Sequence, residues 1–473
     1  MSGGQEVTRL GAVELAQCIR GGKLGAAEVL QAHLAAIAHH NPAVNAICTL
    51  AAEQAMQAAQ GIDEAIARGE DPGPLAGVPV GIKDVTLTAG IRTTFGSRLY
   101  ADYVPREDAE VVARLRAAGA VIVGKTNTPE FAAGANTVNA VFGATRNPWD
   151  LRLSASGSTG GGAAALACGM IALAEGTDFG GSLRTPAAFC GVVGLRTTAG
   201  LVPKHPSVLP WHDQSVEGPM ARSAADCALM LDAMTGLSAN SPLSCVPPWK
   251  SALAIVQATE SLAGVRLAWC PDIAGIGVDP EIERVCRAAA DGLVQAGATV
   301  EHVSFDLSDG RDAFLALRAQ AMVGTHWDRL DKLDQINPNL AGNIRAGLEV
   351  GIRDIAAAER KRAAVWHRWC VLFEKFDLLL SPTTPVPPFP VEQNFPDEVN
   401  GRKLGSYVDW IAPTFLVSLA TLPAASVPAG RTASGLPVGL QIVGPRFAEP
   451  RILAAAKIVE RMRPIGWPAD RTP

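Results

Sequence analysis

Three short segments of this chain combine basic or nucleophilic side chains with glycine, and each combination has a chemical use. The first is Gly81-Ile82-Lys83-Asp84, which follows an apolar run, so that Lys83 would lie where a buried strand ends. Burial disfavours the charged form of a lysine and lowers its pKa toward neutrality. A neutral amine can serve as a general base. The alternative is an ordinary lysine with an exposed tip or an ion pair with Asp84.

The second segment, residues 156–162, reads Ser-Gly-Ser-Thr-Gly-Gly-Gly and precedes an alanine-rich stretch. Backbone N–H groups at the start of a helix suit an anion or an oxyanion. The segment lacks the GxxxxGK[ST] and GxGxxG patterns of nucleotide-binding loops. Because Ser156 stands first, it also departs from the GxSxG nucleophile elbow. A flexible turn is the alternative.

The third segment, residues 176–184, reads Gly-Thr-Asp-Phe-Gly-Gly-Ser-Leu-Arg. Two glycines before Ser182 let the backbone turn sharply and direct consecutive N–H groups at one point, as an oxyanion hole requires. Asp178 and Arg184 flank this turn and are placed to pair across it. A structural turn with a solvent-facing ion pair is the alternative.

The elements that would position these segments alternate between helical and strand-like patterns. The charged stretch 312–375 predicts a helical peripheral cover, and the whole pattern favours one α/β domain with a flanking helical part. We predict helices over 14–20, 26–40, 53–68, 108–118, 163–174, 280–296 and 449–462, and strands over 75–80, 121–123, 265–269, 300–303, 376–380 and 438–443.

Composition predicts a globular protein with a large core, because 48% of the 473 residues are hydrophobic and only 18% are charged. The net charge of −5, without a Lys/Arg-rich stripe, argues against nucleic-acid and membrane-surface partners. Nine cysteines without CxxC or CxxH spacing predict buried reduced thiols, as in a cytoplasmic protein, and no zinc site.

Nothing in the sequence predicts export or membrane insertion. The first six residues, Met1 to Glu6, lack the basic-then-apolar pattern of a signal peptide. The uncharged stretches 153–174 and 411–430 are interrupted by glycines or prolines, so that neither predicts a membrane span.

Taken together, the glycine-rich segments resemble the amidase signature family. The resemblance runs from Gly157-Ser158-Thr159-Gly160-Gly161 through residues 176–195, and it weakens only between about residues 240 and 375. It implies a single large α/β/α sandwich with a mixed central sheet. It also suggests an N-terminal helical segment (1–70) packed on the amidase domain (71–473). Further similar pieces are residues 77–84, 124–130, 147–149, 381–383 and 435–441.

The resemblance implies a role for individual residues. The family's base, relay serine and nucleophile fall on Lys83, Ser158 and Ser182, and the relay serine is expected to follow a cis peptide bond from Gly157. No cofactor or metal is implied. The remaining expectations are an oxyanion hole (N–H groups of Phe179, Gly180, Gly181 and Ser182), supporting residues (Thr159, Asp178 and Arg184) and tentative substrate contacts (Ala132 and Gly157).

Two departures from the family pattern lie beside the relay serine: Ser156 stands for a glycine and Thr159 for a serine. Further candidates for the acyl pocket are Trp211, Met322, Trp327 and Trp410.

The predicted activity is hydrolysis of a small linear carboxylic amide to the acid plus ammonia or amine, through an acyl-enzyme on Ser182, the reaction of EC 3.5.1.4. A homodimer is compatible with this. One alternative is the A subunit of a glutamine-dependent Glu-tRNA(Gln)/Asp-tRNA(Asn) amidotransferase, although its tyrosine-rich segment is not evident in residues 310–365, which contain no tyrosine. Another is a catalytically silent binding protein on the same scaffold.

Overall fold

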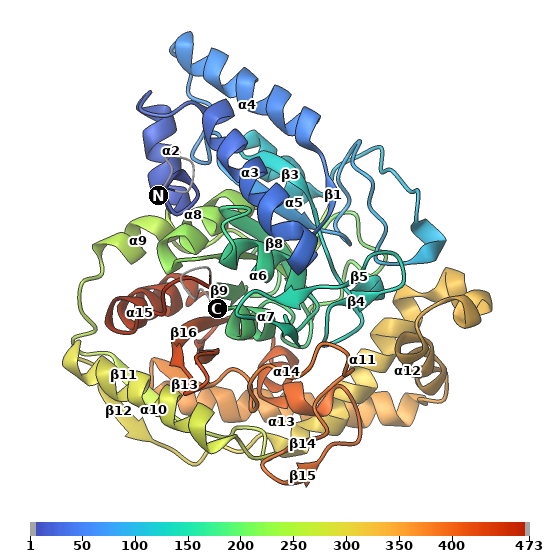
Figure 1. The fold of residues 1–473 in the computed structure, drawn as a ribbon. Helices are drawn as coiled ribbons and strands as arrows, with labels where there is room; N and C mark the ends of the chain where they lie inside the picture. The colour runs from blue at the N-terminus through green and yellow to red at the C-terminus, as the bar shows by residue number, and fades with distance from the viewer. Residues whose placement is uncertain (1–5, 469–473) are drawn as a thin grey trace.

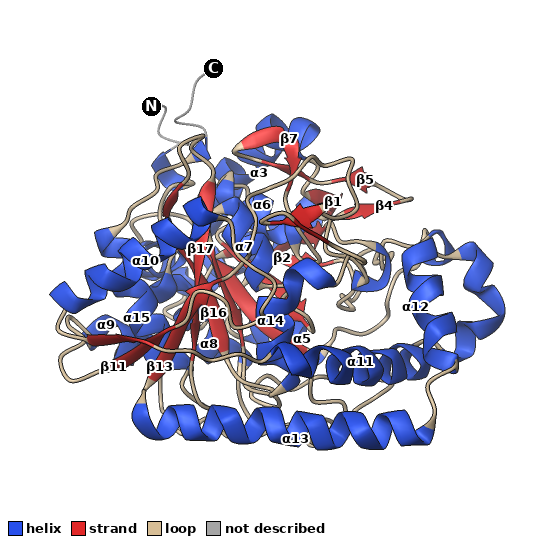
Figure 2. Ribbon diagram, turned by 90° about the horizontal axis from the view of Figure 1, so that it is seen from below, coloured by secondary structure: helices blue, strands red, loops and turns tan. Residues whose placement is uncertain are grey.

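The structure, a computed structural model, describes residues 6–468. Its centre is an 11-stranded mixed sheet in the order β1-β3-β2-β8-β10-β9-β16-β17-β13-β11-β12. Helices enclose the sheet, so the predicted α/β class with a central mixed sheet is confirmed (Figures 1 and 2). Its strands are β1 (Ile47–Leu50), β2 (Pro79–Lys83), β3 (Val121–Thr126), β8 (Leu173–Asp178), β9 (Val193–Arg196), β10 (Val216–Ala221), β11 (Arg266–Trp269), β12 (Thr299–His302), β13 (Leu378–Pro382), β16 (Ala424–Arg431) and β17 (Pro437–Val443).

Short strands form three two-stranded sheets outside the central one: β4 (Val138–Asn139) with β5 (Gly143–Ala144), β6 (Arg146–Asn147) with β7 (Asp150–Ser154), and β14 (Glu398–Val399) with β15 (Arg402–Lys403). The α-helices are α2 (Ala12–Arg20), α3 (Ala26–Val44), α4 (Ala52–Ala67), α5 (Glu110–Ala117), α6 (Gly160–Ala167), α7 (Arg184–Cys190), α8 (Ala224–Met234), α9 (Ala252–Ala258), α10 (Pro280–Gln295), α11 (Arg311–Thr325), α12 (Pro338–Leu348), α13 (Ile352–Lys375), α14 (Ala412–Leu419) and α15 (Glu449–Met462). The 3₁₀ turns are η1 (Arg98–Tyr100), η2 (Glu130–Ala132), η3 (Ser308–Gly310), η4 (Trp327–Gln335) and η5 (Asp409–Ile411).

The predicted helical cover of residues 312–375 is confirmed. Helix α11 contacts both α12 and α13, η4 connects α11 to α12, and the three helices lie at the border of the molecule (Figure 2). A small apolar cluster that includes Leu340 and Ile344 packs this cover against the loop around Phe131 and Leu99.

Two predicted elements differ from the structure near the candidate site. The strand begins at Pro79 and includes Lys83, because residues 75–78 form a turn in which Val78 N–H donates to the Leu75 carbonyl at 2.9 Å. Helix α6 ends at Ala167, and Gly169, with φ +68°, turns the chain into β8.

The first 70 residues share the main apolar core with β2 and β3, since Leu15, Leu30, Val80 and Val123 belong to one cluster. They are not purely helical, because β1 pairs antiparallel with β3 in the central sheet. The boundary between residues 70 and 71 stays a prediction.

Between residues 6 and 468, no helix is both long and apolar enough to traverse a bilayer. The expectation about a signal peptide concerns mainly residues 1–5, which lie outside the described residues.

All nine cysteines are unpaired, but only four are buried and Cys370 is exposed.

Candidate active site

The central feature of the site is the Lys83 amine at the end of β2. Strand β2 lies between β3 and β8 and runs parallel to both, which places Lys83 inside the sheet rather than at an edge. Its side chain is fully buried. Lys83 Nζ lies 2.7 Å from Ser158 Oγ, 2.9 Å from Thr159 Oγ1 and 2.9 Å from Thr177 Oγ1. Three hydroxyl groups, rather than a carboxylate, therefore surround this amine.

Burial lowers the pKa of Lys83 to about 7, although the charges of Glu175 and Asp178 oppose that shift. A neutral amine has two N–H groups and one lone pair. The three hydroxyl partners satisfy these three groups when the two N–H groups donate to Thr159 and Thr177 and the lone pair accepts the Ser158 proton. The arrangement suits a general base at neutral pH.

Ser158 lies just before α6 in a loop with little freedom. The Gly157–Ser158 peptide bond is cis, which confirms the expectation from the resemblance. The Thr185 hydroxyl donates to the Gly157 carbonyl at 3.0 Å, and Ser156 Oγ lies 3.0 Å from Thr185 Oγ1. The unusual Ser156 thus adds a hydrogen bond that a glycine could not make. Both interactions tie the relay loop to α7.

Ser182 lies in the turn between β8 and α7 and is partly exposed, so that a substrate can reach it. Its main-chain carbonyl accepts a hydrogen bond from Thr159 N–H at 3.2 Å, which joins the two glycine-rich loops. Among residues 6–468 the Ser182 hydroxyl makes no hydrogen bond. In enzymes without substrate, catalytic hydrogen bonds are often long and tighten only when substrate binds.

A fully buried ion-pair network holds the Ser182 turn. Arg184 contacts Asp178 in a bidentate manner, with Nε to Oδ2 at 3.0 Å and Nη2 to Oδ1 at 2.9 Å. Arg196 on β9 adds a second contact to Asp178 Oδ1 at 3.3 Å. Burial alone would raise the pKa of Asp178, but the two guanidinium groups hold it well below its usual range. The predicted pair therefore exists, but in the core rather than facing solvent.

Three of the four predicted oxyanion donors are available in this geometry. Among the described residues, the N–H groups of Phe179, Gly180 and Ser182 have no hydrogen-bond acceptor. Gly181 is different, because its N–H donates to Asp178 Oδ1 at 3.0 Å. Gly181 shapes the turn instead of contributing a donor.

Replacing Gly181 with alanine is expected to displace the neighbouring N–H groups of Gly180 and Ser182 and so to lower kcat by about 10²- to 10³-fold, the usual cost of losing an oxyanion donor. The residue has φ +125°, and a Cβ there would lie 2.7 Å from the Cβ of Thr414, so the turn must move. Steady-state kinetics with an amide substrate measures this. Gly264→Ala is the matched control, because Gly264 also has a positive φ (+80°) but no atom within 4 Å of the added Cβ. Equal activity of the two variants would contradict this role for the turn.

The predicted substrate-contact residues separate into three groups. Gly157 is buried, and a Cβ on it would lie 3.0 Å from the Gly134 carbonyl, whereas Ala132 is half-buried with φ +57° in the adjoining loop. Trp410 is fully buried, and its ring stacks on that of Phe189 with 5.6 Å between the ring centroids. The remaining three candidates lie in or beside the helical cover: Met322 packs on its small apolar cluster, and Trp211 and Trp327 are exposed.

The sequence interpretation missed Thr177 and Arg196. Thr177 lies inside the quoted segment, but only its 2.9 Å contact with Lys83 Nζ reveals its place at the site. Arg196 follows the apolar run Val192-Val193-Gly194-Leu195, and a charged side chain after such a run was a usable signal for a buried ion pair.

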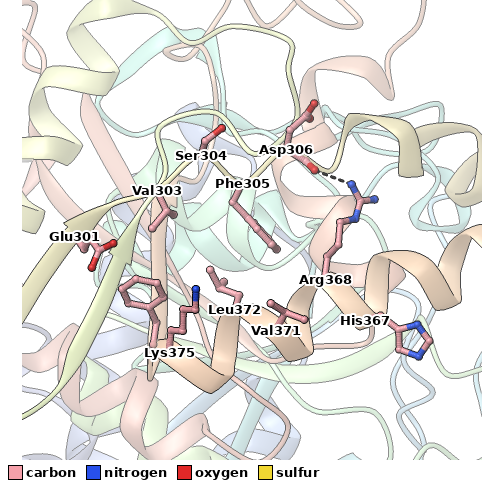
Figure 3. A pocket seen from close by; sticks show the side chains of 11 residues that line it. Glu301, Val303, Ser304, Phe305, Asp306, His367, Arg368, Val371, Leu372 and Lys375 are labelled. Atoms are coloured by element: carbon pink, nitrogen blue, oxygen red, sulfur yellow. Dashed lines mark hydrogen bonds between the residues drawn. The ribbon is translucent and has the colours of Figure 1, made fainter.

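A cavity of about 540 Å³ lies elsewhere, between the end of β12 and α13 (Figure 3). Its walls include Val303, Phe305, Leu372 and Lys375. At one side of it Arg368 donates a hydrogen bond to the Asp306 carbonyl at 2.8 Å. Strand β12 is the sheet edge farthest from β1, so this cavity is separate from the Lys83 site. In the described part of the chain, no cluster of three or more His, Cys, Asp or Glu side chains is arranged to hold a metal ion.

A protein family and named relatives match nearly the whole chain. The profile of the family described as Amidase matches residues 28–453. An acylamidase from Rhodococcus erythropolis is 35% identical over 475 residues, covering 99% of this chain and 98% of that protein. The A subunit of a glutamyl-tRNA(Gln) amidotransferase from Moorella thermoacetica is 36% identical over 484 residues, covering 96% and 97%. The chain belongs to the amidase signature family.

Solved structures show the same fold. A bacterial aryl acylamidase of the amidase signature family superposes with a TM-score of 0.91 at 28% identity, covering 99% of this chain and 100% of that one. The A subunit of a glutamyl-tRNA(Gln) amidotransferase from Thermotoga maritima superposes with a TM-score of 0.71 at 27% identity, covering 98% and 94%. Membership of this family of amide hydrolases supports hydrolysis of an amide bond.

Proposed function

We propose that this protein is a free-standing amidase that hydrolyses a small carboxylic amide to the acid and ammonia or an amine. The observation that carries the proposal is the fully buried Lys83 amine, 2.7 Å from Ser158 Oγ and lacking an ion-pair partner among residues 6–468. Such an amine can accept a proton at neutral pH, which an exposed lysine cannot do efficiently.

The reaction proceeds in two stages. Lys83 takes the proton of Ser158, Ser158 takes the proton of Ser182, and Ser182 Oγ forms a bond to the carbonyl carbon. The N–H groups of Phe179, Gly180 and Ser182 stabilise the oxyanion. The proton then returns through Ser158 to the amide nitrogen, the C–N bond breaks, and the amine leaves. Water, activated by the same groups, hydrolyses the acyl ester on Ser182.

The substrate class follows from the relatives and the site. Proteins named acylamidase and aryl acylamidase cover this chain almost completely, which supports a small acyl amide as the substrate. The proposed reaction needs no cofactor, since side chains supply the nucleophile and the base. We also place the enzyme in the cytoplasm, as a monomer or a homodimer.

A second candidate function is that of the amidotransferase A subunit, because relatives with that name are 36% and 37% identical, against 35% for the acylamidase. The solved A subunit superposes less closely than the aryl acylamidase, with TM-scores of 0.71 and 0.91. The absence of tyrosine from residues 310–365 also favours the free-standing amidase.

A panel of substrates assayed with the purified chain alone distinguishes the two functions. It should contain aliphatic amides, aryl amides, one hydrazide and glutamine, each followed by release of ammonia, amine or hydrazine. We expect hydrolysis of at least one acyl amide without any partner protein. Activity restricted to glutamine, and only in the presence of partner proteins and tRNA, would establish the second function instead.

A further inference from the structure

A second buried lysine and two carboxylates lie next to Lys83 but outside the proposed proton-transfer chain. They are Lys125 on β3, Asp84 after β2 and Glu175 on β8, and all have a relative exposure of 0%. Burying ionisable groups is costly unless they are paired and hydrogen-bonded. The cost of burying this cluster beside the proposed base therefore indicates that the cluster has a function.

The Glu175 carboxylate is held by two hydrogen bonds to the chain around Lys83. Its Oε2 accepts the Lys83 main-chain N–H at 3.1 Å, and its Oε1 accepts the Thr86 hydroxyl at 3.1 Å. The Lys125 amine donates to the Thr86 carbonyl and to Thr88 Oγ1, the latter at 2.7 Å. Thr86 thus connects the Glu175 carboxylate to the Lys125 ammonium group, and the strand register supports this, because Ile82 of β2 is aligned with both residues.

The electrostatic effects have definite signs. Burial raises the pKa of Glu175 above its usual value, and the charges of Lys125 and then Lys83 oppose that shift only in part. Burial lowers the pKa of Lys125 to about 8, opposed first by Asp84 and then by Glu175. At Lys83, Glu175 is the largest influence that raises the pKa against burial, ahead of Asp178, whose charge is balanced by two arginines.

We propose that Glu175, which Thr86 links to Lys125, is a positioning residue that sets the proton affinity of Lys83. The inference rests on the proposed function, in which Lys83 is the base. Without this anion the buried amine would be a weaker base. With it, the amine is neutral near pH 7 yet basic enough to take the Ser158 proton. The other charged or titratable groups facing this cluster are Asp84, Cys48 on β1, Asp108, Asp178 with Arg184 and Arg196, and Glu217 on β10.

The test compares the pH dependence of kcat/KM in the wild type, Glu175→Gln, Lys125→Met and the double variant. Glu175→Gln keeps the shape of the side chain and removes its charge. The midpoint of the acid limb, the pH at which kcat/KM has fallen to half on the acidic side, is therefore expected to fall by about one pH unit, the usual effect of one nearby charge. Lys125→Met should shift it in the same direction, because Glu175 then takes up a proton. The midpoint of the double variant should lie close to that of either single variant, because both substitutions remove the same negative charge. Glu449→Gln is the control, because Glu449 is equally buried but bonds to Thr198.

A loss of activity in Glu175→Gln with an unmoved midpoint would indicate a structural role and overturn the inference. A midpoint that rises in Lys125→Met would also overturn the inference. If Glu175→Gln does not fold, the Lys125→Met variant alone provides the test. Failure of the proposed function looks different, because the wild type itself would then hydrolyse no amide and show no acid limb. The rate of Ser182 labelling by a fluorophosphonate across the pH range gives an independent measurement.

Discussion

Replacing Ser182 with alanine is expected to lower kcat for amide hydrolysis by about 10⁴- to 10⁶-fold, the cost of removing a catalytic nucleophile. Ser182 has the one side-chain hydroxyl in the turn 179–182, whose N–H groups we propose as oxyanion donors. The measurement is amine release under saturating substrate. A fluorophosphonate probe followed by intact mass should add one group to the wild type and none to the variant.

The matched control is Ser251→Ala, which removes a serine that caps the start of α9. This variant should keep wild-type kcat and full labelling. Labelling of the Ser182→Ala protein, or retention of its activity, would show that another residue is the nucleophile. An unlabelled and inactive wild type would support the catalytically silent binding protein.

Replacing Lys83 with methionine is expected to lower kcat/KM by about 10²- to 10⁴-fold, the range for loss of a general base. Methionine preserves much of the apolar stem but cannot accept a proton. The wild type should lose activity as the pH falls through about 7, because its buried amine becomes protonated, and the variant should lack that limb.

Lys457→Met is a suitable control for this change. Lys457 is a lysine of α15 that pairs with Glu260, remote from β2. Its substitution should leave both the rate and the acid limb unchanged. A Lys83→Met enzyme with the wild-type pH profile would require a different base.

The candidate site was predictable because its reactive residues lie in three short glycine-containing segments, 81–84, 156–162 and 176–184. Lys83, Ser158 and Ser182 each follow a glycine closely, and glycine-rich turns can be identified without knowing the fold. The partners that come from other strands were not predictable in the same way. Glu175 reaches Lys83 across a strand pair, and which strands pair is a tertiary property.

The main error in the fold concerned the predicted helix 163–174. An alanine-rich apolar run satisfies both a buried helix and a buried strand, so periodicity cannot place the boundary between them. The structure divides the run at Gly169, and Leu173 begins β8.

Several central strands were missed because their residues have low β propensity. Strand β10 reads Val-Glu-Gly-Pro-Met-Ala and β16 contains three alanines and Pro428. Proline is tolerated in β16 because the register shifts between Pro428 and Gly430, as at a β-bulge. Burial between neighbouring strands, rather than local preference, decides these elements.

The central claim, an uncharged amine at position 83, is tested most directly by NMR titration of the enzyme labelled with ¹³C at lysine Cε. We predict one lysine resonance that titrates near pH 7 and is absent from the Lys83→Met spectrum. A Lys83 resonance that titrates near 10.4, the value of an exposed lysine, would contradict the account, because the amine would then be charged at neutral pH.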